Sequence, residues 1–108
     1  MNKWNIPIDL EKAILSRDTH CIYCGVKFDI ANLKRGDKPS WEHIINNAKI
    51  ITLENIALCC VSCNASKGSK PLTVWLDSNY CKRKNISHTT IATVAKNYLN
   101  SVNQVGEE

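Results

Sequence analysis

The sequence lacks the features that mark membrane, fibrous and secreted proteins. None of its apolar runs approaches the roughly 18 residues that a transmembrane helix needs, so we expect no membrane partner. No segment repeats another and none is of low complexity, which argues against a repeat protein or a linker. The first ten residues carry charged and proline side chains in place of an apolar segment, so we expect no secretory signal. A cytoplasmic, reducing location with reduced cysteines is the expectation.

The chain is short and moderately basic. Its 108 residues fit one domain, expected over residues 1–108, with a small core that often needs additional stabilisation. The net charge is +4 at pH 7, and cations gather at Lys34, Arg35 and Lys38, at Lys67 and Lys70, and at Lys82, Arg83 and Lys84. This balance favours the phosphate backbone of a nucleic acid as partner, although scattered solubilising lysines would explain the charge alone equally well.

Two Cys-x-x-Cys pairs stand out among the six cysteines. The first pair is Cys21 with Cys24, and the second is Cys60 with Cys63. Each pair places two thiolates on one side of a tight turn, and two such pairs can close a tetrahedral zinc site. Four thiolates leave no open position, so we expect a structural zinc ion and not a catalytic one. Residues 25–59 then form an excursion that starts and ends at the metal.

Cys59, Cys81 and His20 are the alternatives to this ligand set. Cys59 adjoins Cys60 and could replace it, but only Cys60 has the two-residue spacing to Cys63. We expect Cys59 and Cys81 to lie in the core as small apolar side chains. His20 precedes the first pair, where a polar surface role is the commoner one for a single histidine.

The apolar pattern predicts an α+β fold. Helices are expected at about 7–17, 63–67, 71–81 and 89–102, and strands at 40–45 and 55–59. The apolar face of the first helix consists of Ile6, Leu10, Ile14 and Leu15. Residues 28–39 should form a loop with at most one helical turn, and Gly68 should end the short helix. The expected architecture is a hairpin and a short helix around zinc, flanked by helices from both ends of the chain.

Three segments together resemble the HNH endonuclease family. They are Cys-Ile-Tyr-Cys-Gly at 21–25, Trp-Glu-His-Ile-Ile at 41–45, and Leu-Glu-Asn-Ile-Ala-Leu-Cys-Cys-Val-Ser-Cys-Asn-Ala-Ser-Lys-Gly at 53–68. Their order, spacing and residue types agree with the four-cysteine branch of that family. The resemblance covers about residues 12–71. It implies a ββα-metal core (the HNH or His-Me finger) stabilised by a structural zinc ion on the four cysteines, with a helical extension over about 72–103.

By this resemblance His43 is the general base and Glu42 is a ligand of a catalytic divalent ion. A histidine with an ordinary pKa near ~6.5 can accept a proton from water at neutral pH. Asn64 matches a second ligand, whose amide oxygen suits Mg²⁺ or Mn²⁺. Glu42 and His43 are neighbours on a strand and need a bend or a strand end to converge. Taken alone, the pair would indicate a surface salt bridge, and Asn64 a helix cap.

Asn55 and Lys67 complete the set that the resemblance implies. Asn55 is expected to hold the loop between the strands through backbone hydrogen bonds and to orient the base without touching the metal. Lys67 lies one helical turn after Asn64 and could contact a phosphate oxygen; a solvated lysine is the alternative. Two positions depart from the family pattern: Glu42 stands where Asp is commoner, and Asn46 stands where proline is frequent.

The resemblance therefore implies a metal-dependent endonuclease that hydrolyses DNA phosphodiester bonds and leaves 5′-phosphate and 3′-hydroxyl ends. DNA would be bound mainly through its phosphate backbone. The alternative is a zinc-knuckle nucleic-acid-binding module or an accessory factor without cleavage activity. A homodimer or larger complex would allow both strands to be cut, because symmetry pairs two single-strand sites.

Overall fold

A two-stranded sheet with helices on both sides makes up the domain. The computed structural model describes residues 4–29, 31 and 34–106. In chain order the elements are α1 (Ile8–Arg17), the 3-10 turn η2 (Arg35–Asp37), β1 (Pro39–His43), β2 (Ile56–Cys60), α2 (Val61–Lys67), α3 (Leu72–Trp75), α4 (Asn79–Lys84) and α5 (Thr93–Gly106). The described part of the chain is therefore a small α+β domain, as expected. None of its described helices combines the length and apolar character needed to cross a membrane.

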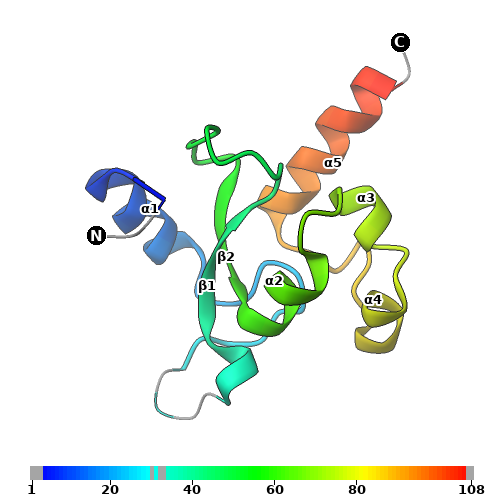
Figure 1. The fold of residues 1–108 in the computed structure, drawn as a ribbon, viewed down its shortest axis with the longest axis horizontal. Helices are drawn as coiled ribbons and strands as arrows, with labels where there is room; N and C mark the ends of the chain where they lie inside the picture. The colour runs from blue at the N-terminus through cyan, green and yellow to red at the C-terminus, as the bar shows by residue number, and fades with distance from the viewer. Residues whose placement is uncertain (1–3, 30, 32–33, 107–108) are drawn as a thin grey trace.

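The two strands pair in antiparallel register around the middle of the sequence. Trp41 lies opposite Leu58, Glu42 opposite Ala57, and His43 opposite Ile56. Because successive side chains on a strand alternate, this register sends Glu42 to one face of the sheet and His43 to the other. Figure 1 shows α1 on one side of the sheet and α2, α3 and α4 on the other.

Each face of the sheet carries its own apolar cluster. On the side of α1, a small cluster of buried residues consists of Ile6, Ile14, Ile56 and Leu58. On the other side, a larger cluster includes Tyr23, Trp75, Cys81, Ile91 and Leu99 with Ala57 and Cys59 of β2. All five residues of β2 are buried, so this strand lies between the two clusters and forms the centre of the domain.

The first half of the chain follows the expected order, with boundaries that shift by one or two residues. The first helix, both strands, the short helix α2 and a helical turn within 28–39 are confirmed. Positions 30, 32 and 33 of that expected loop lie outside the described residues. Gly68 ends α2 with a φ of 54°, a left-handed conformation that glycine adopts at little cost. Leu15 was expected on the apolar face of α1, but its side chain is 50% exposed, and its neighbour Ile14 is the buried residue.

The helices after Pro71 differ from the expectation. The single helix expected at 71–81 is two short helices, α3 and α4, separated by residues 76–78. Ser78 begins the second one, because its hydroxyl accepts a hydrogen bond from the backbone N–H of Cys81 at 3.3 Å. The helix expected from residue 89 starts at Thr93. The hydroxyl of Thr90 bonds the carbonyls of Asn85 and Ser87 and holds residues 85–90 in a turn instead.

Candidate functional site

Two turns bring the four expected zinc ligands together. Cys21 and Cys24 flank the turn that follows α1, and Gly25 continues it with a φ of 80°, a conformation open to glycine. The backbone N–H of Gly25 donates to the carbonyl of Cys21 at 3.0 Å and closes this turn. Cys60 is the last residue of β2 and Cys63 lies in the first turn of α2, so a strand-to-helix junction presents the second pair.

The four sulfur atoms have the spacing that a tetrahedral metal requires. All four Sγ atoms lie within 4.8 Å of one another, and those of Cys24 and Cys60 are 3.8 Å apart. A Zn–S bond of about 2.3 Å places tetrahedral sulfur atoms about 3.8 Å apart. Among the described residues, this is the only group of three or more His, Cys, Asp or Glu ligands. The cluster could therefore bind a metal ion such as zinc.

Hydrogen-bond donors surround these thiols. The Sγ of Cys21 accepts the backbone N–H bonds of Tyr23 and Cys24, each at 3.4 Å. The hydroxyl of Tyr80, from α4, donates to the Sγ of Cys63 at 3.3 Å. Hydrogen bonds among the four thiols, with Cys24 foremost for Cys21, lower the pKa of Cys21 and raise those of Cys60 and Cys63. The hydroxyl of Tyr80 acts on the pKa of Cys63 in the lowering direction and so favours its thiolate, the metal-binding form.

Cys59, Cys81 and His20 lie outside the four-cysteine group. Cys59 is fully buried next to Ser40, and burial raises the pKa of its thiol well above the usual range. Cys81 is also buried, within the larger apolar cluster. His20 is exposed, and its Nδ1 lies 2.9 Å from the hydroxyl of Thr19. The geometry thus favours Cys60 over Cys59 as the ligand, as the spacing predicts.

Glu42 is buried in β1 and faces the side of the sheet that carries α2. Its Oε2 accepts a hydrogen bond from the hydroxyl of Tyr23 at 2.6 Å and lies 3.2 Å from the Nζ of Lys67. Burial raises the pKa of its carboxyl, while Lys67 and Tyr23 act in the lowering direction. The residue is only 4% exposed, so the surface salt bridge considered as an alternative is not what the structure contains.

His43 ends β1 and lies on the opposite face. Its ring meets that of Trp4 edge to face, with 4.9 Å between the ring centroids. Its Nε2 is buried and makes no hydrogen bond in the part of the chain that the structure describes. Burial and the charge of Lys67 lower the pKa of the imidazole, so His43 is neutral at pH 7. A buried nitrogen without a partner is uncommon in folded proteins and marks a candidate functional group.

Asn55 holds the loop between the two strands. Its Oδ1 accepts the backbone N–H of Ile45 at 2.6 Å, and its Nδ2 donates to the carbonyls of Ile45 and Ile50 at 3.2 and 3.1 Å. The backbone N–H of Ile44 donates to the carbonyl of Asn55 at 3.0 Å. Asn55 therefore has the loop contacts expected for it, and its part in orienting His43 stays a prediction.

Asn64 joins α2 to β1. Its Nδ2 donates to the hydroxyl of Ser40 and to the carbonyl of Trp41, both at 3.0 Å. These two bonds use both protons of the amide nitrogen. Asn64 does not cap the helix, because the side chain of Cys60 does so by accepting the N–H of Cys63. The helix-cap alternative for Asn64 is therefore wrong.

Lys67 lies in the interior and not at the surface. Its side chain is 1% exposed, and its Nζ lies 3.2 Å from Oε2 of Glu42 and donates to the carbonyl of Ile44 at 3.2 Å. One helical turn separates it from Asn64, so α2 lays both side chains along β1. Neither the phosphate contact nor the solvated lysine that the sequence suggests fits this position, because the ammonium group is directed at a buried carboxylate.

The donor set beside Glu42 fits a divalent cation by its chemistry. Carboxylate and amide oxygens are the hard ligands that Mg²⁺ and Mn²⁺ take in proteins. Tyr23 and Lys67 hold Oε2 of Glu42, the backbone of His43 also bonds this carboxyl, and the bonds from Nδ2 of Asn64 hold its amide. The structure thus gathers Glu42, Asn64 and Lys67 on the α2 side of β1 and leaves His43 at the strand end on the other face.

Reasoning from the sequence did not identify Tyr23 and Tyr80, whose hydroxyls contact Glu42 and Cys63. Tyr23 offers a signal, because a residue between two ligands of a Cys-x-x-Cys pair is held beside the metal site by the turn itself. Its hydroxyl reaches Glu42, while its ring packs against Trp75 with 4.9 Å between the ring centroids. Tyr80 has no such local signal, because α4 meets Cys63 only through the tertiary fold.

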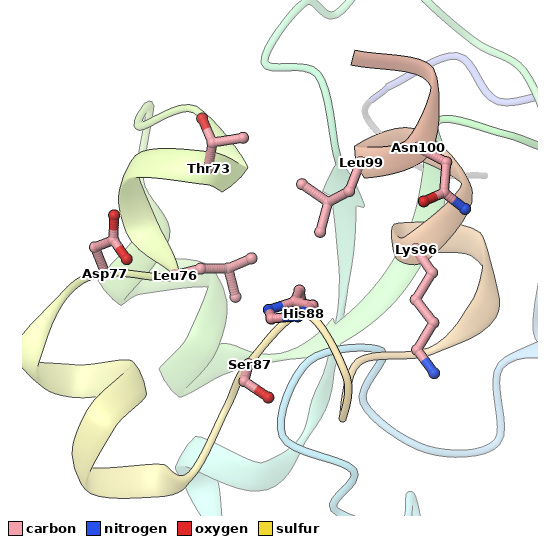
Figure 2. A pocket seen from close by; sticks show the side chains of 8 residues that line it. All are labelled: Thr73, Leu76, Asp77, Ser87, His88, Lys96, Leu99 and Asn100. Carbon is pink, nitrogen blue, oxygen red and sulfur yellow. The ribbon is translucent and has the colours of Figure 1, made fainter. Parts of the chain in front are cut away.

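Two surface hollows lie elsewhere on the molecule. One of about 410 Å³ is lined by residues of α3, of α5 and of the segments that precede and follow α4. Figure 2 shows Leu76 and Leu99 pointing toward each other there, with His88 close by. The other, of about 500 Å³, lies between α5 and residues 45–55 and includes Asn55. Neither is lined by Glu42, His43 or Asn64.

Comparisons with models of protein families, with curated proteins and with solved structures gave no match. Function is therefore inferred from the chain's own residues and their contacts.

Proposed function

We propose that this protein is a metal-dependent HNH endonuclease that hydrolyses DNA phosphodiester bonds. The observation that carries the proposal is the arrangement around β1. A strand, a loop, a strand and a helix follow one another along the chain. His43 lies at the end of β1, Asn55 holds the loop between the strands by hydrogen bonds, and Asn64 on α2 donates a hydrogen bond to β1. The four-cysteine cluster supports the structural zinc ion of such a ββα-metal core.

His43 is the proposed general base. Its Nε2 takes a proton from water as the water attacks phosphorus, a step that needs the neutral imidazole. Burial and the positive charge of Lys67 lower the pKa of His43 and keep it neutral at pH 7. Nε2 is buried beside Trp4 and lies on the face of β1 opposite Glu42 and Asn64. A local rearrangement at the end of β1 therefore has to admit water and bring the base and the metal ligands to the same phosphodiester.

Glu42 and Asn64 are the proposed ligands of the divalent ion, Mg²⁺ or Mn²⁺, through Oε1 and Oδ1. Such an ion, when bound, stabilises negative charge on the scissile phosphate and on the leaving 3′ oxygen. The two ligand side chains are held by their other atoms: Glu42 by Tyr23 and Lys67, and Asn64 by bonds to β1. A site whose ligands are oriented in advance loses little entropy when it binds.

The distribution of basic residues supports DNA as the substrate. Lys82, Arg83 and Lys84 form the exposed last turn of α4. Lys84 lies over the ring of Tyr80, with Nζ 5.2 Å from the centroid, and Tyr80 in turn contacts the cysteine cluster. Cations grouped in this way suit phosphate contacts, which give affinity that falls steeply with salt and depends little on sequence.

The test is a supercoiled-plasmid assay of zinc-loaded protein with and without Mg²⁺ or Mn²⁺. It compares the wild type with His43→Ala and with the matched control His88→Ala, a histidine that lines the hollow in Figure 2, away from β1. We expect metal-dependent loss of supercoiled DNA with the wild type and with His88→Ala. Loss of a general base should slow His43→Ala by about 10²–10⁴-fold.

Two outcomes would contradict parts of the proposal. Cleavage by His43→Ala at the wild-type rate would exclude His43 as the base. Absence of cleavage by all three proteins, with DNA still retained in a gel-shift assay, would favour the zinc-knuckle binding module or accessory factor. The proportion of nicked to linear product then indicates whether a homodimer or larger complex acts on both strands.

A further inference from the structure

The ammonium group of Lys67 occupies a cation position beside Glu42. Its Nζ lies 3.2 Å from a carboxylate oxygen of Glu42 and 3.2 Å from the backbone carbonyl of Ile44. Carboxylate and carbonyl oxygens are also the donors that hard metal ions use. The side chain of Lys67 is 1% exposed and that of Glu42 is 5% exposed, so solvent and salt screen this pair only weakly.

The surrounding structure fixes Lys67 in this position. It is the last residue of α2, where the partial negative charge at a helix C-terminus favours a cation. The hydroxyl of Tyr23 donates to the same Oε2 of Glu42 at 2.6 Å, so that oxygen is held from two sides. Lys67 is thus a fixed internal charge and not a side chain that swings freely toward a ligand.

The pair leaves the site without net charge. The negative charge of Glu42 is cancelled by the ammonium group of Lys67, whose Nζ lies 3.2 Å from Oε2. In the described part of the chain, Lys67 forms no ion pair with another carboxylate, and the cysteine cluster is the only group of three or more candidate metal ligands. A divalent cation therefore gains little attraction from the free site and is repelled by Lys67 at short range.

We propose that Lys67 makes binding of the divalent ion depend on phosphate. The site takes Mg²⁺ or Mn²⁺ together with a nucleic-acid phosphodiester, whose negative charge offsets that of the ammonium group, and not in the free protein. This inference rests on the proposed nuclease function. Lys67 acts here as a positioning residue, because it holds Glu42 through Oε2 and sets the charge of the site without touching the substrate.

Binding of Mn²⁺, followed by the electron paramagnetic resonance of the free ion, tests this dependence. The thiols are first occupied by zinc, and His43→Ala protein keeps a short DNA duplex uncut. The same titration is repeated with the Glu42→Gln/His43→Ala protein. The difference between the two titrations gives the Mn²⁺ bound through Glu42 and excludes ions bound by DNA alone. We expect the apparent affinity for Mn²⁺ to be at least about tenfold higher with the duplex than without it.

Removing the internal charge should abolish this dependence. In Lys67→Met, which keeps the length of the apolar stem, we expect Mn²⁺ to bind without DNA at least about tenfold more tightly than in the parent protein. Lys70→Met is the matched control, because Lys70 is exposed and bonds the carbonyl of Ser66; it should behave like the parent. Circular dichroism and zinc content establish that each variant is folded.

The outcomes separate the inference from the function on which it rests. Tight Mn²⁺ binding to the parent protein without DNA, lost with Glu42→Gln, would overturn the role of Lys67 and leave the nuclease proposal intact. Absence of Glu42-dependent binding with DNA would overturn both. If Lys67→Met does not fold, tight Mn²⁺ binding to the parent protein without DNA would still overturn the inference, because that result requires no change at Lys67.

Discussion

Replacing Lys67 by methionine should destabilise the protein far more than replacing a surface lysine. The change leaves the Glu42 carboxylate, only 4% exposed, with the Tyr23 hydroxyl but without its counter-charge. It also removes the donor to the carbonyl of Ile44. Breaking a buried ion pair by removing one partner costs about 3–5 kcal/mol. The free energy of unfolding of a domain is about 5–15 kcal/mol, so Lys67→Met should lose between about a fifth of this margin and all of it.

The cost of Lys67→Met should depend on pH, with a sign set by Glu42. Burial raises the pKa of this carboxyl and Lys67 opposes that effect, so removal of Lys67 raises the pKa further. A carboxyl with a raised folded-state pKa contributes stability that is complete below its unfolded pKa of about 4.3. That contribution is lost as the pH rises through the folded-state value. The variant should therefore be least destabilised near about pH 5 and more so near about pH 8.

Urea unfolding of zinc-loaded protein at both pH values measures this cost. Lys70→Met provides the reference, since its cost should stay within about 0.5 kcal/mol and its zinc site responds to pH in the same way. The double variant Glu42→Gln/Lys67→Met removes both charges and should recover most of the loss, because a buried pair contributes less than breaking it costs. If Lys67→Met matched Lys70→Met at both pH values, the buried pair would not exist in solution.

Two further predictions concern single hydrogen bonds. Tyr80→Phe removes the donor to the Cys63 thiolate and should lower zinc affinity about tenfold, measured by competition with a chelator; Tyr98→Phe, on α5, should leave the affinity unchanged. Asp18→Ala removes the acceptor that lies 3.0 Å from the buried N–H of Leu58. It should cost about 1–3 kcal/mol in urea unfolding, and a value near zero would mean that this N–H finds another acceptor.

The cysteine cluster and the order of the central elements could be predicted because both depend on local spacing. A Cys-x-x-Cys pair sets its two thiols within one turn, and two pairs require the chain between them to return to the metal. That constraint predicts the hairpin over β1 and β2 and the short helix after Cys63. Gly68 likewise ends α2 for a local reason, its positive φ. The identity of the bound metal and the catalytic roles stay predictions, because no local rule fixes them.

The misplaced features depend on contacts between distant parts of the chain. The pattern at 71–81 has helical spacing throughout, yet the hydroxyl of Ser78 starts a second helix where the chain bends around the core. Lys67 looks like a surface lysine because its neighbours Ser66 and Gly68 are small and polar. Lys67 is buried because its ammonium group pairs with Glu42 of β1, and the two residues meet only when α2 packs along β1. Charge alone therefore misassigns a lysine whose partner lies on another element.

The candidate site and the cysteine cluster are one unit of the chain. Tyr23 lies between the first two cysteines and holds Glu42, while Asn64 directly follows the last cysteine and Lys67 comes one turn later. A metal ion in the cluster would fix both segments at once, and with them the orientation of the carboxylate and the amide. A metal ion in the cluster would then decide the geometry of the candidate site. Loss of that metal should release Tyr23 and α2 together, so protein stripped of zinc and then freed of the chelator should lose the Glu42-dependent binding of Mn²⁺, and added zinc should restore it.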